Sequence, residues 1–322
     1  MTVDELIDEA IDEETEGIDK RRRSIKTRIL QFRTYLVTEA NLRPKTIQKH
    51  MSNIHAFYNH FDIELPTLPP LKFDEEEKEQ LTYFDLPTRE QIGMACEIAG
   101  ILVGSVLLFM ASSGTARTEC ANMTLGDFIE ACNGYYKSET IPEIIEELAN
   151  SIEPIVPTFY LWRQKTSKKY YTFCTPEAAN AIIEWLQLRI KVCEVHGEEL
   201  TMEDSLWGLT KRQISSQFAK LNDELEFGFK GPYRFLRPHT IRKFHASNLG
   251  LSEAKIDLLQ GRSRDKIHET YIKTNPSELK KMYMNVMENV TIGKLGQKQI
   301  IHEDFTINMN LNFYGKEYGV EL

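Results

Sequence analysis

The chain has 322 residues, of which 41% are hydrophobic, and a formal net charge of -9 at pH 7. This length and composition predict a large buried core divided between about two domains. The five cysteines are odd in number and form no C-x-x-C pair. We therefore expect neither a disulfide framework nor a zinc site, and we expect a reduced, cytoplasmic protein. The acidic N-terminus gives no sign of a secretory signal.

The charge is unevenly distributed along the chain. Residues 1–19 contain nine acidic residues and no basic one, whereas residues 201–276 contain thirteen Lys or Arg against nine Asp or Glu. A basic face can therefore coexist with acidic segments. Because the local field matters more than the total charge, the net negative charge does not exclude a nucleic-acid partner.

The N-terminal part of the chain is predicted to be helical. Residues 1–23 are acidic and then basic, which indicates a mobile or weakly helical arm. Apolar residues at helical spacing predict one helix over about 24–40 and a second that begins at Pro44 and continues through Tyr58. Together these helices define a first domain over residues 24–65.

A linker and a long apolar helix are expected next. Residues 66–87 combine prolines with an acidic run, which is typical of a solvated linker. Thr88 can cap a helix that contains Ile92–Met110. The uncharged stretch 98–116 raises the question of a membrane span, but its apolar part is only about fourteen residues, whereas a span takes about 20. We therefore expect a buried core helix and no membrane association.

The remaining elements are a hairpin, several helices and a late strand region. Residues 155–175 alternate polar with aromatic or β-branched residues around a polar turn at 164–169, which predicts a β-hairpin. Pro176 opens a further helix, and helices continue to about residue 290. The tail, 291–322, alternates again over 298–314 and is expected to form one or two strands. The predicted fold class is mainly α with a small antiparallel β-sheet.

Four residues carry the clearest chemical signal: Arg117, His239, Arg242 and Tyr271. Arginines match the charge and the bidentate geometry of a phosphate. A tyrosine can form a covalent phosphate ester, although its pKa of about 10 means that it must be activated. A positioned acid is still needed for the leaving 5′-oxygen, and the scheme needs no metal ion or other cofactor.

These residues, in this order, resemble the tyrosine recombinase (integrase) family, including its phage-integrase and Xer-like branches. The motifs that carry the resemblance are SSGTARTECANMTLGDF, RPHTIRKFHAS and LLQGRSRDKIHETYIK. The first places Asp127 ten residues after Arg117. Where the family commonly has a glutamate, this chain has Cys120, with Glu119 one residue earlier, as in archaeal-looking members.

The resemblance implies a catalytic lysine on the β-hairpin. We assign it to Lys165, because the family places this lysine early in the turn, and we keep Lys168 and Lys169 as competitors. Its implied role is general acid for the 5′-oxygen. His239 is implied to hydrogen-bond the phosphate or to accept the tyrosine proton.

The third motif departs from the family at one position. Arg262 stands nine residues before Tyr271, where the family has a histidine or a tryptophan. An arginine can donate to a phosphate oxygen but cannot act as a base. Tyr283 is the main rival nucleophile, and His268 is too close to Tyr271 to fit the pattern. We expect His245 and Arg237, two further residues of the second motif, to be structural or to contact the backbone.

The resemblance implies a two-domain clamp on double-stranded DNA. A helical core-binding domain (24–65) precedes a catalytic domain (88–290), and the tail (291–322) could dock on its own or a neighbouring subunit. The implied enzyme is a site-specific recombinase or integrase that forms a 3′-phosphotyrosine and acts as a homotetramer on two sites. Two alternatives stay open: a type IB topoisomerase-like enzyme that relaxes DNA, and a catalytically inactive DNA-binding regulator of the same fold.

Overall fold

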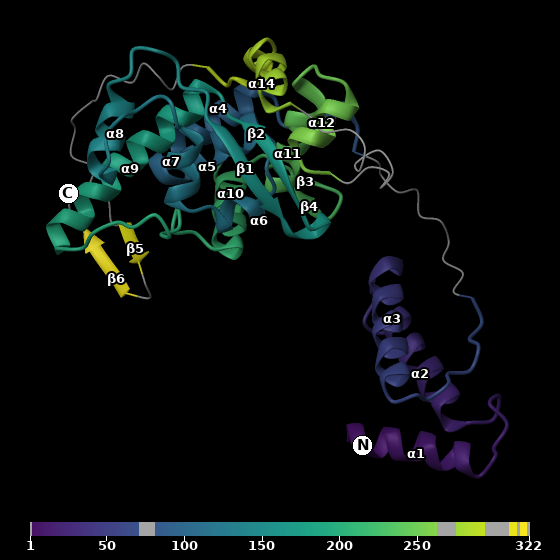
Figure 1. The fold of residues 1–322 in the computed structure, drawn as a ribbon. Helices are drawn as coiled ribbons and strands as arrows, with labels where there is room; N and C mark the ends of the chain where they lie inside the picture. The colour runs from purple at the N-terminus through teal and green to yellow at the C-terminus, as the bar shows by residue number, and fades with distance from the viewer. Residues whose placement is uncertain (1, 71–80, 263–274, 294–308, 314–315, 321–322) are drawn as a thin grey trace. The chain divides into compact units, whose positions relative to one another are not determined.

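The computed structural model describes residues 2–70, 81–262, 275–293, 309–313 and 316–320 (Figure 1). The chain divides into two compact units, Met1–Glu79 and Gln80–Leu322. The described residues are mainly helical and include three two-stranded antiparallel sheets. This agrees with the predicted mainly α fold class with a small antiparallel sheet component.

Three helices form the first unit: α1 (Val3–Thr15), α2 (Ser24–Thr38) and α3 (Pro44–His60). The two helices predicted for this part of the chain thus occur, as α2 and α3, close to their expected bounds. Pro44 occupies the first turn of α3, where its missing N–H would have no partner in any case. Ile25, Ile29 and Ile47 are buried between these helices and form much of the small core of this unit.

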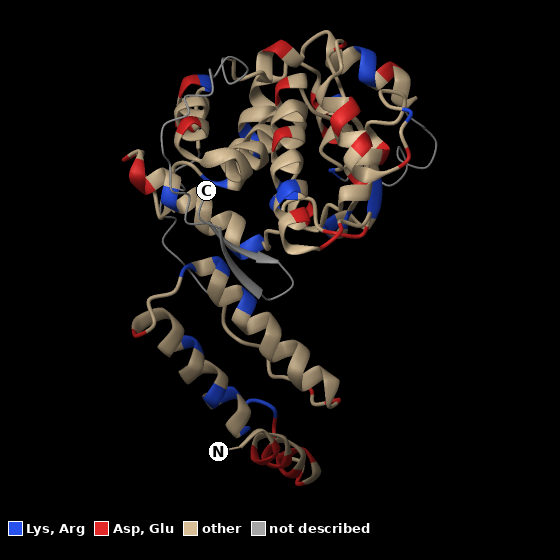
Figure 2. Cartoon of the chain, turned by 90° about the vertical axis from the view of Figure 1, so that its left-hand side faces the viewer, with Lys and Arg blue, Asp and Glu red and all other residues tan. Residues whose placement is uncertain are grey.

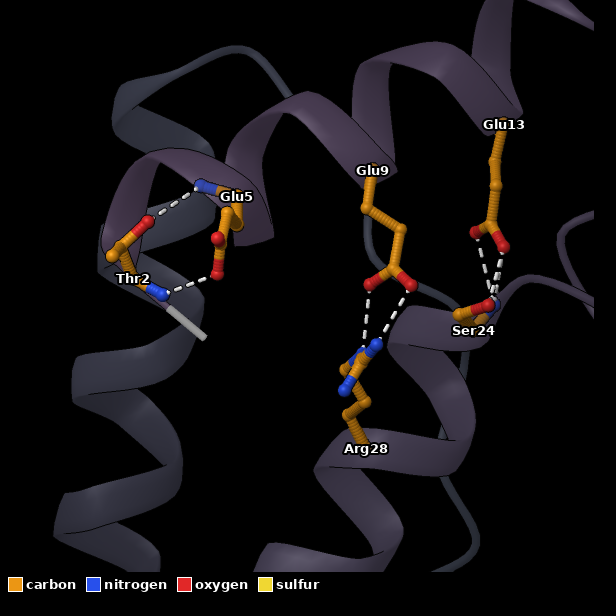
Figure 3. Close-up of polar contacts among 6 residues, drawn as sticks. All are labelled: Thr2, Glu5, Glu9, Glu13, Ser24 and Arg28. Carbon is orange, nitrogen blue, oxygen red and sulfur yellow. Dashed lines mark hydrogen bonds and ion pairs between the residues drawn. The ribbon is translucent and has the colours of Figure 1, made fainter.

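The N-terminal segment differs from the expected mobile or weakly helical arm. Thr2 caps α1 through a capping box with Glu5, in which each residue's side chain accepts from the other's backbone N–H. Ala10 is buried in the same core as the other two helices. Figure 3 shows Glu9 and Glu13 of α1 in contact with Arg28 and Ser24 of α2. Two of its carboxylates have partners on α2, since Glu9 accepts from Arg28 and Glu13 accepts from Ser24.

The second unit is built around an apolar helix. Thr88 caps α4 (Arg89–Ile98) as expected, but the chain then breaks before α5 (Gly100–Ser113). The predicted single helix is therefore two, because Gly100 has a φ of 65° and leaves the right-handed helical region. From Val103 onward α5 is buried throughout. No helix among the described residues is long and apolar enough to span a bilayer.

Further helices complete this unit (Figure 1). They are α6 (Arg117–Asn122), α7 (Leu125–Ala131), α8 (Ile141–Ala149), α9 (Pro176–His196), α10 (Lys211–Glu224), α11 (Pro238–Asn248), α12 (Glu253–Leu259) and α14 (Pro276–Met284). Two tryptophans anchor this core with their indole N–H groups. Trp207 donates to the hydroxyl of Ser105 at 3.0 Å, and Trp185 donates to the carbonyl of Leu206 at 3.0 Å. Each buried indole is thereby satisfied, as dense packing requires.

The predicted hairpin is formed by β1 (Thr158–Arg163) and β2 (Lys168–Phe173), which pair antiparallel. A 3-10 turn at Gln164–Thr166 joins the strands, and Ser167 completes it with a φ of 50°. Alternate residues face the core, among them Phe159, while Tyr160 lies half exposed. A shorter pair follows, β3 (Phe229–Lys230) with β4 (Tyr233–Arg234).

The C-terminal tail contains a strand pair, as the alternating pattern predicted. β5 (Met309–Phe313) pairs antiparallel with β6 (Lys316–Val320). The second strand lies beyond the segment 298–314 that carried the prediction. The part of that segment from 298 to 308 lies outside the described residues.

Candidate active site

The first motif turns sharply between α5 and α6. Gly114 ends α5 in the left-handed conformation, with a φ of 66°, and its N–H donates to the carbonyl of Met110 at 3.1 Å. A Cβ atom at this position would lie 2.7 Å from Nε2 of Gln260, so only glycine fits. Arg117 begins α6, lies exposed and donates to the hydroxyl of Ser215 on α10.

The second motif lies on α11. Thr240 caps the start of this helix, because its hydroxyl accepts from the N–H of Arg237 at 3.1 Å and donates to the carbonyl of Phe235 at 2.8 Å. His239 and Arg242 follow at a spacing of three residues, which places them on one side of the helix. Their environments differ, since His239 lies at the surface and Arg242 is buried.

Arg242 joins three segments that are distant in sequence. Its Nη1 donates to the carbonyl of Gly114 and its Nη2 to the carbonyl of Gln260, both at 2.6 Å. Burial, and then the neighbouring Arg163, lower the pKa of Arg242 to about 10, so the guanidinium stays charged at neutral pH. The ends of α5 and α12 are therefore held on α11 by one buried cation.

The β1–β2 hairpin is fastened to the segment that precedes residue 263. The carbonyl oxygens of residues 260–262 accept, in order, from Nη1 of Arg163, from Oγ1 of Thr166 at 3.1 Å and from Nζ of Lys168 at 2.6 Å. Side chains from one hairpin thus bind three consecutive peptide groups. The hairpin turn and the backbone of Arg262 are consequently positioned together.

Glycine is required within this fastened segment. Gly261 has a φ of 59°, and a Cβ atom there would lie 2.6 Å from the ring of Tyr170 on β2. Tyr170 is buried, and burial raises the pKa of its phenol far above the usual range. A neutral phenol therefore packs against the backbone of Gly261.

The three lysines of the hairpin differ in their contacts. Lys165 lies exposed in the 3-10 turn. Lys168 donates to the carbonyl of Arg262, and Nζ of Lys169 lies 5.0 Å from the ring centre of Tyr160. The side chains of Lys168 and Lys169 thus each have a partner within the protein.

Glu119 and Cys120 have different surroundings on α6. Glu119 is buried, and its Oε1 lies 4.0 Å from Nε of Arg163. The thiol of Cys120 lies 3.2 Å from the hydroxyl of Thr115, and burial raises its pKa to about 12. Glu119 can therefore balance the charge of Arg163, whereas Cys120 is a neutral packing residue.

Cations gather around His239. Partial burial of the imidazole is the largest cause that lowers its pKa, and four positive neighbours act in the same direction: Lys243, Arg237, Arg242 and Arg262. The imidazole is therefore neutral at pH 7 and able to accept a proton. Nη1 of Arg262 lies 3.6 Å from the carboxylate of Asp257, which partly offsets this positive charge.

Comparison with known proteins gives no assignment by sequence. No family model matches the chain, and no curated protein matches it. Among solved structures, the chain is similar to one described as the crystal structure of XerA recombinase, with 15% sequence identity and a TM-score of 0.37 over 86% of this chain and 89% of that one. The function is therefore inferred from the residues of the site.

The two candidate nucleophiles differ in what the structure describes. Tyr271 lies outside the described residues, as does His268. Tyr283 is fully buried in α14, and its hydroxyl donates to the carbonyl of Ser112 at 3.0 Å. Burial raises the pKa of Tyr283 well above its ordinary value, which makes it a poor nucleophile.

The remaining members of the second motif have structural contacts, as expected. His245 is fully buried, and its Nδ1 lies 2.9 Å from Nε2 of Gln260. The guanidinium of Arg237 lies 4.3 Å from the ring centre of Tyr233. Asp127, from the first motif, caps α7 in a capping box with Thr124.

Sequence reasoning missed Arg163 and Gln260. Both are buried, and Arg163 donates to the same carbonyl, that of Gln260, as Arg242 does. Arg163 faces inward at the end of β1, between the exposed residues 162 and 164. A charged residue at an inward position of an alternating strand was the available signal, because buried charges need partners.

Proposed function

We propose that this protein is a DNA strand-breaking and rejoining enzyme, a site-specific recombinase of the tyrosine recombinase type. The observation that carries the proposal is the contact made by Arg242, whose guanidinium binds the segment before Arg117 and the segment before Arg262. Because Thr166 and Lys168 bind the latter segment as well, the turn that carries Lys165 belongs to the same assembly.

The proposed reaction is attack on a DNA phosphodiester by the phenolic oxygen of Tyr271. A new bond forms between this oxygen and phosphorus, and the bond from phosphorus to the 5′-oxygen breaks. The neutral imidazole of His239 accepts the phenol's proton, and Lys165 donates a proton to the leaving 5′-oxygen. The 3′-phosphotyrosine stores the energy of the broken bond, so rejoining by a 5′-hydroxyl needs no nucleotide.

Positive charge around the phosphate lowers the barrier. Arg117 is exposed at the start of α6, and its proposed role is to donate to a non-bridging oxygen. Arg242 differs from Arg117 in its proposed role, because two of its N–H groups donate to backbone carbonyls. It sets the positions of its neighbours and adds a buried positive charge that the neutral carbonyls do not cancel.

The decisive experiment is capture of a covalent protein–DNA adduct. The full chain is incubated with nicked suicide duplexes, and the products are separated on a denaturing gel. Wild type should form an adduct, Tyr271→Phe should form none and Tyr283→Phe should retain it, because the buried hydroxyl of Tyr283 serves packing. An adduct from Tyr271→Phe would disprove this assignment of the nucleophile. Relaxation of supercoiled DNA without partner exchange would instead identify a topoisomerase-like activity, and DNA binding without any adduct a regulator.

The role of Lys165 is tested with a leaving group that needs no acid. Lys165→Ala should slow cleavage far more than it weakens DNA binding, and a 5′-bridging phosphorothiolate should restore much of the rate. Lys169→Ala is the matched control, since Lys169 lies against Tyr160 and should affect cleavage little. Equal rescue of Lys165→Ala and Arg242→Ala would contradict the division between proton donor and phosphate charge.

A further inference from the structure

The acidic helix α1 places two carboxylates on α2. Glu9 accepts from Nε and Nη2 of Arg28, each at 2.7 Å, in a bidentate arrangement. Glu13 accepts from the N–H of Ser24, at 2.9 and 3.0 Å for its two oxygens, and from the hydroxyl of Ser24 at 2.5 Å. Figure 3 shows the two contacts side by side along α2.

A second basic residue lies at the start of α2, next to Ser24. Arg23 precedes α2, its side chain is buried, and its Nη1 lies 3.6 Å from a carboxylate oxygen of Glu14. Among the described residues this buried Nη1 has no hydrogen-bond partner. It is therefore a donor that points to an acidic neighbour without being satisfied by it.

The hydrogen-bond donors of Arg28 and Ser24 are of the kind that bind phosphate groups. The planar fork of Arg28 matches two oxygens of one anion. The N–H at the start of α2, together with the hydroxyl of Ser24, forms an anion site that the helix dipole favours. Ser24 and Arg28 are four residues apart on one side of the helix, about 6 Å along its axis. Glu9 and Glu13 repeat this spacing on α1.

The contact between α1 and α2 is of a kind that can be exchanged. Glu9 and Arg28 remain partly exposed, with 29% and 39% of their side chains accessible. Ala10 is the buried residue of α1, and Ile7 is partly buried beside it. A small apolar contact and exposed ion pairs hold a helix weakly in water and more weakly in salt.

We propose that Glu9 and Glu13 occupy phosphate-binding positions on α2, so that α1 competes with the backbone of duplex DNA for Arg28 and Ser24. The choice of DNA as the competing anion rests on the proposed function. Figure 2 shows acidic residues gathered on α1 and basic residues on α2 and on the segment that joins α1 to α2. Binding of DNA to Arg28 and Ser24 then requires displacement of α1, and this requirement lowers the affinity of the intact chain for DNA.

The test compares two double variants of the full chain that change the charge equally. Glu9→Ala/Glu13→Ala removes the two carboxylates that contact α2. Asp8→Ala/Asp12→Ala removes two exposed carboxylates of the same helix that make no hydrogen bond or ion pair with α2 among the described residues. Alanine maintains the helix in both. Affinity for a fluorescent duplex of arbitrary sequence is measured by anisotropy at low salt.

We expect the first variant to bind DNA about tenfold more tightly than wild type, as two restored phosphate contacts would produce. The control should gain only about twofold from the reduced general repulsion. Arg28→Gln should weaken binding little in wild type, where Glu9 already occupies Arg28, and severely in Glu9→Ala/Glu13→Ala. This dependence on background is the signature of competition for one residue.

Three results would overturn the inference or its basis. Equal gains from both double variants would mean that α1 acts through charge alone. Unchanged affinity in both, with wild type still binding DNA, would make α1 a purely structural helix and leave the proposed function intact. Absence of DNA binding by wild type and by every variant would overturn the proposed function itself. If circular dichroism shows that the double variant unfolds, Glu9→Ala alone, which retains the Glu13 contact, should still gain about threefold.

Discussion

Two arginines, Arg28 in the first unit and Arg242 in the second, differ in what they donate to. Arg28 is partly exposed and binds a carboxylate, so its charge is cancelled by its partner. Arg242 is buried and binds two carbonyl oxygens, which orient it without cancelling its charge. Burial and Arg163 lower its pKa only to about 10. The first contact can be exchanged for another anion, whereas the second maintains a fixed positive charge inside the protein.

The largest effect is expected when the buried member of this comparison is removed. Arg242→Ala should lower the free energy of unfolding of the second unit by about 3–4 kcal/mol, because the buried carbonyl of Gly114 loses its charged donor and a cavity remains. Thermal and urea denaturation followed by circular dichroism measure the change. Arg242→Lys, which keeps the charge without the planar fork, should recover less than half of it. Wild-type stability of Arg242→Ala would show that this network is not structural.

A second variant sharpens the comparison by changing the backbone beneath the same network. Gly261→Ala should destabilise the second unit by about 2–3 kcal/mol, since it combines left-handed strain with an overlap on the ring of Tyr170. Gly197→Ala is the matched control, because Gly197 has a similar φ of 68° but nothing within 4 Å of the added methyl group. It should lose only about 1 kcal/mol. Equal losses for both variants would remove the packing role of Tyr170.

The buried network should also make stability depend on pH. Burial, and then Arg242 and Arg262, lower the pKa of His245 from 6.5 to about 3. The folded state therefore binds its proton less readily than the unfolded state, and stability present above pH 6.5 is lost as the pH falls toward 3. Between pH 7 and pH 5 this residue should account for about 2 kcal/mol.

Urea denaturation at the two pH values, compared with the variant His245→Asn, isolates this contribution. The variant removes the titrating group, so its loss of stability between pH 7 and pH 5 should be smaller than that of wild type. An unchanged difference between the two pH values would mean that His245 is not the group responsible.

The smallest effect on stability is expected for the exposed member of the comparison. Arg28→Ala should shift the thermal midpoint of the first unit only slightly, because water and salt ions replace an exposed ion pair readily. The shift should shrink further when salt is added, whereas that of Arg242→Ala should not. A large, salt-independent loss for Arg28→Ala would place it in the same class as Arg242.

The amino-acid sequence by itself determined the local features of this protein. Helical periodicity located α2 and α3, alternation located the β1–β2 hairpin, and spacing placed His239 and Arg242 on one side of α11. These features depend on neighbouring residues, so a linear pattern can reveal them. The helix break at Gly100 is also local. The sequence did not predict it, because glycine tolerates both helical and left-handed backbone conformations.

Only the tertiary structure decided which polar groups meet. Arg242 and Gly114 are 128 residues apart, and Arg163 and Gln260 are 97 apart. Arg28 and Glu9, although near in sequence, meet because α1 folds back on α2. No linear pattern specifies these partners, because a buried donor takes whichever acceptor the packed helices bring within reach. Burial and pairing, which separate a fixed cation from an exchangeable one, therefore become defined only in the folded chain.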